Sequence, residues 1–132
     1  MRDSWAKQTA MATLGASLRT VAPGHVVVDL RRQPALVQQH GFVHGGVLAA
    51  VMDSCCGYAA FSLFDETDSV LSAGFSVNLL APADGDLFEL HGNVIKAGRT
   101  LTIAEAIALR SGDQKLIAKM TAQIFTIKHL KE

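Results

Sequence analysis

An apolar run over residues 44–61 constrains this chain more than any other feature, because it contains no proline, no Lys or Arg, and one acidic residue, Asp53. Alanine, leucine, methionine and valine dominate the run, which predicts a helix over residues 44–61. Apolar positions surround this helix on almost every side, and a helix of that kind is expected to be buried on every side. Gly57 lowers the local helix propensity by about 1 kcal/mol relative to alanine, so we expect it to mark a close backbone approach.

The segments on both sides of the predicted helix alternate apolar with polar residues, and this period of two predicts β-strands. Two strands are expected within residues 15–32, on either side of a turn at Ala22-Pro23-Gly24. Further strands are expected over residues 69–79, 87–96, 100–110 and 115–128, with turns between them. In the first of these, the alternation predicts Leu71, Phe75 and Leu79 on one face and Ser72 on the other.

Short turns between alternating strands predict an antiparallel meander. Residues 3–13 predict a short amphipathic helix with Trp5 and Met11 as its apolar anchors. The expected fold class is therefore α+β: one long buried helix wrapped by a curved antiparallel sheet of five or six strands, with a short N-terminal helix. The length of 132 residues suits a single domain over residues 1–132.

The composition excludes several classes of protein. Twelve Lys and Arg residues balance twelve Asp and Glu residues, so the chain has no basic excess for binding nucleic acid. A hydrophobic content of 49% excludes disorder and, with a net charge of +0, favours self-association. Adjacent Cys55 and Cys56 cannot easily pair with each other, so we expect small core residues in a reducing compartment. Without a signal-like segment or an apolar stretch of bilayer length, we expect a cytoplasmic protein that does not enter membranes.

The segment His44-Gly45-Gly46 stands where the long helix is expected to begin. The first N–H groups of a helix have no intrahelical partner, and the helix dipole adds partial positive charge at that end. Glycines allow a substrate oxygen to approach such groups, so the Gly45 N–H could form an oxyanion hole. The alternative is that the glycines only make a tight junction between loop and helix.

Asp53 places a carboxylate in the middle of an otherwise apolar helix, where burial is costly without a partner or a function. It is either paired with a backbone N–H or an arginine, or it acts as a functional acid or base. Asp53 follows Gly45 by eight residues, which is about 12 Å along a helix. If both residues serve one reaction, they must come from different subunits, and a two-fold dimer with antiparallel helices would contain two such sites.

The chain contains Gly41-x-x-His44-Gly45-Gly46, then Asp53, then Pro82-Ala83-x-Gly85-Asp86, then Gly98-Arg99-Thr100-Leu101. This set of motifs resembles the hotdog-fold acyl-CoA thioesterases, and most closely the phenylacetic-acid-degradation thioesterases. The resemblance covers residues 15–128. It implies a long helix wrapped by a sheet, in a homodimer that is paired edge to edge, has active sites at the subunit interface and is often doubled to a tetramer.

The resemblance also implies roles for individual residues. The Gly45 N–H, with His44 beside it, would polarise the thioester carbonyl, and Asp53 would act as general base or nucleophile. Gln38, at a position where the family more commonly has Asn, would help to position water or the thioester. Ser72 would orient the attacking water.

The remaining candidates concern the substrate. Lys96 and Arg99 flank a turn, which is either a solvated hairpin or, by the resemblance, a contact for the phosphates of coenzyme A. We expect Gly46 to lie beside the bound thioester. Apolar residues that could line an acyl pocket are Phe42, Val51, Cys55, Tyr58 and Phe75. His40 and His44 are four residues apart, but the glycines around them disfavour a helix, so we expect no metal site.

These features together predict a cofactor-free hydrolase that cleaves an acyl-CoA thioester into a carboxylic acid and free CoA. Asp53 would either activate water or attack the carbonyl itself, and the sequence does not separate the two routes. One alternative is a non-catalytic acyl-CoA binding or regulatory module, which would not need Asp53. The other is a hotdog hydratase or dehydratase, which typically has a catalytic histidine in a local pattern that this chain lacks.

Overall fold

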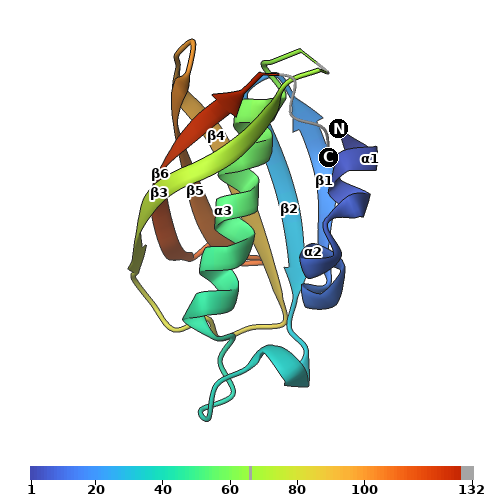
Figure 1. Cartoon of the computed structure of the whole chain (residues 1–132). Helices are drawn as coiled ribbons and strands as arrows, with labels where there is room; N and C mark the ends of the chain where they lie inside the picture. Colours follow the sequence, from blue (N-terminus) through green and yellow to red (C-terminus); the bar gives the residue numbers. More distant parts are fainter. Residues whose placement is uncertain (66, 129–132) are drawn as a thin grey trace.

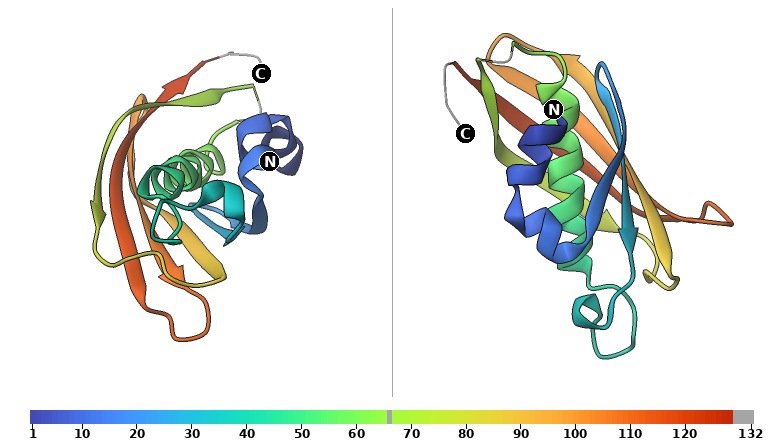
Figure 2. Two further views of the ribbon diagram at one scale, coloured as in Figure 1. Left: turned by 90° about the horizontal axis from the view of Figure 1, so that it is seen from below. Right: turned by 90° about the vertical axis from the view of Figure 1, so that its right-hand side faces the viewer.

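The long helix α3 (Gly45–Phe61) lies at the centre of the computed structural model, which describes residues 1–65 and 67–128 (Figure 1). The helix predicted over residues 44–61 is confirmed, and His44 is its N-cap rather than its first residue. A curved antiparallel sheet surrounds α3 on one side, and the short helices α1 (Arg2–Lys7) and α2 (Thr9–Leu14) lie on the other (Figure 2). This arrangement confirms the hotdog fold that the resemblance implied.

Six strands form the sheet, with bounds close to the predicted ranges. They are β1 (Ala16–Ala22), β2 (His25–Arg31), β3 (Ser69–Leu79), β4 (Leu87–Ala97), β5 (Leu101–Arg110) and β6 (Leu116–Ile127). Their order across the sheet is β1-β2-β4-β5-β6-β3. The predicted meander is correct for β4, β5 and β6 but wrong for β3, which lies at the edge of the sheet and pairs with β6.

The segment between β3 and β4 explains this difference. A turn between neighbouring strands was expected at residues 82–86, but residues 80–86 carry the chain from the edge strand to the other half of the sheet. On the way they pass the start of α3, where the Val43 N–H donates to the Ala83 carbonyl at 3.1 Å. Long-range contacts of this kind leave no periodic signal in the sequence.

Small residues in the centre of the sheet let α3 pack closely against it. In β5 the fully buried side chains are small, namely Thr102, Ala104, Ala106 and Ala108. In β4, a Cβ added to Gly92 would lie 2.4 Å from the Cys55 carbonyl oxygen, so this glycine permits the closest contact with the helix backbone. The expectation for Gly57 was wrong, because a Cβ there would have no neighbour within 4 Å.

A β-bulge divides β3 into two halves. Ser72 and Gly74 pair with consecutive residues of β6, so β3 holds one extra residue between them and its alternation reverses. Before the bulge, Leu71 lies opposite an exposed residue of β6; after it, Phe75 and Leu79 lie opposite buried alanines. The prediction that these three side chains share one face is therefore wrong. Phe75 and Leu79 face the side of α3 but stay 45% and 56% exposed, although Leu79 lies beside Gly45 at the start of α3.

The N-terminal segment forms two short helices where one was predicted over residues 3–13. The break is at Gln8, whose ψ of 87° is not helical. Trp5 and Met11 are buried as predicted, and the Trp5 ring lies 5.1 Å from the ring of Tyr58 in α3, centroid to centroid. Within the described residues, no helix is both long enough and apolar enough to cross a bilayer.

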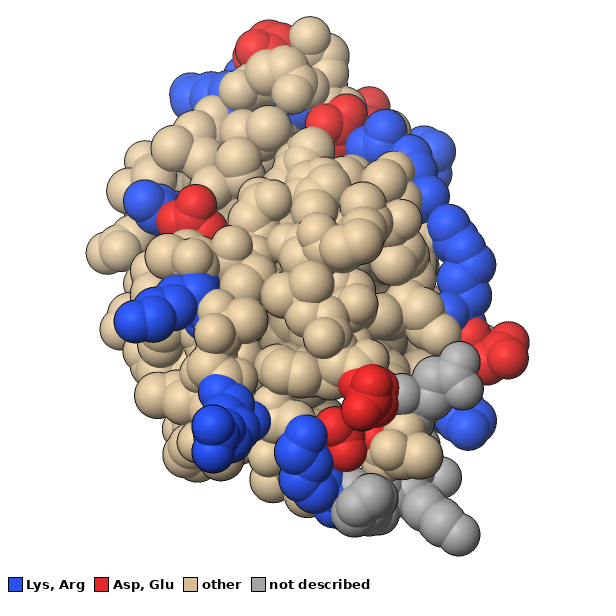
Figure 3. Space-filling model, turned by 90° about the horizontal axis from the view of Figure 1, so that it is seen from above, with Lys and Arg blue, Asp and Glu red and all other residues tan. Residues whose placement is uncertain are grey.

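One end of the molecule, seen from above, has a broad uncharged area at its centre (Figure 3). Basic and acidic side chains both lie around its margin, in agreement with the balanced composition of the chain.

Candidate active site

One face of α3 is not covered by the part of the chain that the structure describes. Gly46, Ala50, Asp53 and Gly57 are spaced four, three and four residues apart, so they form one stripe along the helix, and each is exposed or half-buried. The expectation that α3 is buried on every side is wrong along this stripe. Asp53 is consequently accessible from outside the protein, although it lies on the central helix.

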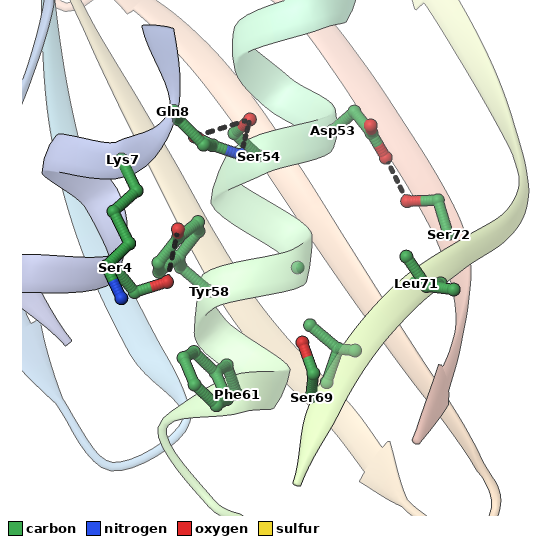
Figure 4. A pocket seen from close by; sticks show the side chains of 12 residues that line it. Ser4, Lys7, Gln8, Asp53, Ser54, Tyr58, Phe61, Ser69, Leu71 and Ser72 are labelled. Carbon is green, nitrogen blue, oxygen red and sulfur yellow. Dashed lines mark hydrogen bonds between the residues drawn. The ribbon is translucent and has the colours of Figure 1, made fainter. Parts of the chain in front are cut away.

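Asp53 lies in a cavity of about 480 Å³, which we call the Asp53 cavity, between α3, β3 and the N-terminal helices (Figure 4). The Ser72 hydroxyl, on β3, donates a hydrogen bond to Oδ1 of Asp53. In the described part of the chain, Oδ2 accepts no hydrogen bond, and Asp53 has neither an arginine nor a backbone N–H as partner. One carboxylate oxygen is therefore held in place while the other faces the cavity without a partner.

The start of α3 leaves one backbone N–H without a partner. The Gly46 N–H donates to Nδ1 of His44 at 2.9 Å, and the N–H groups of Val47 and Leu48 donate to the His44 carbonyl. Because the accepting ring nitrogen carries no proton, the ring hydrogen of His44 is on Nε2 in this arrangement. Within residues 1–65 and 67–128, the Gly45 N–H makes no hydrogen bond, so it is the group that a ligand oxygen can use.

A second cavity, of about 450 Å³, adjoins Gly45 and is called here the Gly45 cavity. Gln38 lines it, and Oε1 of Gln38 accepts from the N–H groups of His40 at 2.6 Å and Phe42 at 3.2 Å. These two hydrogen bonds hold the loop over residues 38–42 together. The amide NH₂ of Gln38 has no hydrogen bond within the described residues. Leu79 lies so close that its Cδ1 would be 2.5 Å from a Cβ at Gly45, so a glycine keeps this space free.

The two cavities share no lining residue. The free carboxylate oxygen faces one of them and the free N–H adjoins the other, on the same helix and about 12 Å apart by helical rise. A single subunit therefore does not bring these two groups to one point.

The structure separates the predicted acyl-contacting residues. Tyr58 lines the Asp53 cavity and Phe42 lines the Gly45 cavity. Val51 and Cys55 are fully buried in the core and line neither cavity, so the expectation for them is wrong. Phe75 lines neither cavity but is exposed on β3.

Lys96 and Arg99 lie where β4 turns into β5, away from both cavities. Both side chains are exposed, and neither lines the Asp53 cavity or the Gly45 cavity. They have no ion-pair partner among the described residues. Their charges are thus available to an anionic ligand that extends along the surface.

Neither cysteine has the properties of a nucleophile. Burial raises the pKa of the Cys56 thiol to about 12, and the negative charge of Asp53 adds to this effect. Burial also raises the pKa of Cys55 well above its usual range, with a further contribution from Cys56. Both side chains stay protonated at neutral pH and serve as small core residues, as predicted.

Several residues of the Asp53 cavity were not predicted. Gly57 and Phe61 follow Asp53 by four and eight residues, so helical spacing alone could have placed them on the same face. Ser54 and the α1–α2 residues Ser4, Lys7 and Gln8 also line the cavity. The residues before α3 carried no such signal, because their place depends on how the N-terminal helices dock.

Comparison with known proteins gives this geometry a context. The thioesterase superfamily matches residues 40–117, which include both cavities' residues on α3. The solved structure of a thioesterase family protein from Silicibacter pomeroyi is 49% identical to this chain, with a TM-score of 0.93 over 96% of this chain and 95% of that one. This likeness extends over both the N-terminal helices and the sheet.

Two more distant structures share the fold. The PaaI protein of the phenylacetic acid degradation operon of E. coli is 17% identical, with a TM-score of 0.89 over 97% of this chain and 91% of that one. A Streptococcus mutans protein bound to acetyl CoA is 22% identical, with a TM-score of 0.79 over 88% and 91%. At these identities the likeness shows the fold alone, without the phenylacetic acid subgroup.

Proposed function

Because this chain belongs to the thioesterase superfamily, we propose that it hydrolyses an acyl-CoA thioester to a carboxylic acid and free coenzyme A. Membership of the family supports thioester hydrolysis as the general reaction. The observation that carries the finer proposal is the Asp53 carboxylate, held by Ser72 at one oxygen and open to a cavity at the other. A carboxylate, a backbone N–H and water are sufficient for this reaction, so no cofactor is required.

Asp53 acts on the thioester carbonyl in one of two ways. As a general base, its free oxygen takes a proton from water while the water oxygen bonds to the carbonyl carbon. The tetrahedral intermediate then breaks its C–S bond, and the departing thiolate receives a proton. As a nucleophile, Asp53 itself bonds to the carbonyl carbon, the thiolate leaves, and water cleaves the resulting anhydride. In both routes, the hydrogen bond from Ser72 fixes the direction of the free oxygen.

The oxyanion is stabilised by the Gly45 N–H of a second subunit. The Gly45 N–H and Asp53 of one chain belong to different cavities about 12 Å apart, so a two-fold partner with an antiparallel α3 must supply the donor. Edge strand β3 supports this homodimer, since its outer edge is unpaired in the described chain and its Phe75 and Leu79 side chains are exposed. The amide NH₂ of Gln38, beside Gly45, positions the thioester or water at the same shared site.

A second surface supports doubling of the dimer to a tetramer. Leu71, Phe125 and Leu101 form one row across β3, β6 and β5 on the outer face of the sheet. Their side chains are 54%, 47% and 41% exposed, and a row of large exposed apolar side chains is typical of an interface. Lys96 and Arg99, exposed at the nearby β4–β5 turn, contact the phosphates of coenzyme A.

A free-thiol assay with a panel of acyl-CoA substrates tests this function. We expect thiol release from at least one acyl-CoA, with the carboxylic acid as the second product. The protein's own cysteines will not interfere, because burial keeps both thiols protonated and inaccessible. Binding of acyl-CoA without thiol release would favour the non-catalytic module instead. Addition of water to an enoyl-CoA with the thioester intact would favour a hydratase.

A further inference from the structure

Gly57 lies in the wall of the Asp53 cavity that α3 provides, and no neighbouring atom requires a glycine there. A Cβ added at this position would meet nothing within 4 Å. The backbone of Gly57 is not in the left-handed region either, so its conformation is open to any residue. Glycine weakens a helix relative to alanine, and here the structure offers no packing reason for that loss. What the missing side chain does leave is open space beside Asp53.

Helical spacing places this open space next to the reacting group. Asp53, Gly57 and Phe61 occupy successive turns on one face of α3, and Figure 4 shows the Asp53 and Phe61 side chains at opposite ends of this row. The row is about 12 Å long by helical rise. Coenzyme A is large and charged and must extend to solvent, so the acyl group is the part of the substrate that enters the cavity. An acyl group whose carbonyl lies beside Asp53 reaches Gly57 with its first carbon atoms.

The other walls of the cavity combine apolar side chains, namely Tyr58, Val70 and Leu71, with polar ones. Ser69 and Ser72 on β3 and Ser4, Lys7 and Gln8 on the N-terminal helices all line it. The Ser54 hydroxyl, on a residue only 8% exposed, makes two long hydrogen bonds of 3.4 and 3.5 Å with the Gln8 side-chain amide. A cavity of about 480 Å³ with these walls suits a compact group.

We propose that Gly57 determines specificity by making room for an acyl group that is branched or cyclic directly beside the thioester carbonyl. This inference rests on the proposed function and adds to it a substrate class and a residue that selects it. A side chain at position 57 would narrow the cavity where such a group is widest. An acetyl group, which ends before this point, would still fit.

The test compares cyclohexanecarbonyl-CoA with acetyl-CoA in the wild type, Gly57→Ala and Gly57→Leu. We expect Gly57→Leu to lower kcat/KM for the cyclic substrate by roughly tenfold or more relative to acetyl-CoA, because misfit of a few carbon atoms has effects of that size. Gly57→Ala should lie between the wild type and Gly57→Leu. Ala10→Leu is the matched control, since it adds the same side chain at an exposed position of α2 outside the cavity and should change neither substrate.

Equal losses for both substrates in Gly57→Leu would overturn the proposal, provided that the variant unfolds at the same temperature as the wild type. Failure of the wild type to release thiol from any member of the acyl-CoA panel would instead contradict the proposed function. The role of Gly57 is then tested by binding alone. Both acyl-CoAs are titrated calorimetrically into the Asp53→Asn variant and into the double variant Asp53→Asn, Gly57→Leu. Selective loss of cyclohexanecarbonyl-CoA binding in the double variant supports the proposal, and unchanged binding refutes it.

Discussion

The two halves of α3 differ in the chemistry that they present. The first turn offers the Gly45 N–H without a hydrogen-bond partner in the described chain, but no carboxylate lines the cavity there. The middle of the helix offers the Asp53 carboxylate with one free oxygen, but no free backbone N–H, because interior N–H groups are bonded within the helix. One helix thus carries the two groups of an acyl-transfer site in places where they cannot meet. If the proposed function is correct, a complete site needs one group from each of two copies of the chain.

Removal of the Asp53 carboxylate should have the largest effect on activity. Asp53→Asn keeps an acceptor for Ser72 but no longer takes a proton, so kcat for thioester hydrolysis should fall by roughly 10²–10⁴-fold. The fold should survive, since Asp53 is half-buried and has no ion pair among the described residues. Steady-state kinetics and circular dichroism measure the two effects. Activity close to that of the wild type would remove Asp53 from the mechanism.

The second group to test is the Gly45 N–H at the start of α3. Gly45→Pro removes the N–H, and loss of one oxyanion donor costs roughly 10²–10³-fold in kcat. Proline suits the first helical position, and His44 before it has an extended ψ of 134°, which proline accepts. Gly45→Ala is the control, because it adds the same Cβ against the flexible, exposed end of Leu79 and keeps the N–H. A loss of the same size in both variants would mean that crowding, not the donor, is responsible.

Mixing the two defective proteins tests whether two subunits share one site. In a dimer of Asp53→Ala with Gly45→Pro, one shared site has both defects and the other has none. Random exchange of equal amounts makes about half of the dimers mixed, so about a quarter of wild-type activity should return. A mixture that remains inactive, with subunit exchange verified by mass spectrometry, would show that each site is built within one chain.

A smaller effect is expected at the strand that faces Asp53. Ser72→Ala removes the hydrogen bond to Oδ1 and lets the carboxylate rotate, which should lower kcat by roughly 10- to 100-fold. Ser72→Thr keeps the hydroxyl and should restore most of the activity. If alanine and threonine behave alike, Ser72 does not orient Asp53 during the reaction.

The smallest predicted effect is a gain in stability. Gly57→Ala places a methyl group where no atom lies within 4 Å, so it should raise the free energy of unfolding by about 0.5–1 kcal/mol through helix propensity alone. Chemical denaturation followed by circular dichroism measures this change. A lower stability would mean that position 57 is more tightly enclosed than the cavity indicates.

Local patterns explain most of what the sequence could predict. α3 and the six strands follow from periodicity, whereas the hydrogen bond from Ser72 to Asp53 was not predicted, because the resemblance gave Ser72 only the role of orienting water. The place of β3 beside β6 was not predictable, because strand pairing depends on contacts between residues far apart in the chain. The same holds for Gln8, whose amide reaches Ser54 only after α1 and α2 have docked. Gly57 was misjudged because a glycine in a helix signals either close contact or open space, and only the neighbouring atoms tell which.

The extra residue in β3 has a consequence for how this strand tolerates insertions and deletions. In a regular strand, successive side chains alternate between the two faces of the sheet, so two side chains seven positions apart would face opposite sides. With the bulge, Ser72 and Leu79 both face the side of α3, although they are seven positions apart. Deleting the extra residue between Ser72 and Gly74 would remove the bulge and leave a regular strand in which both halves keep their present partners in β6 and their present faces. β3 can therefore lose one residue at the bulge without turning either half, whereas a one-residue deletion elsewhere in the strand would turn the residues beyond it to the opposite face.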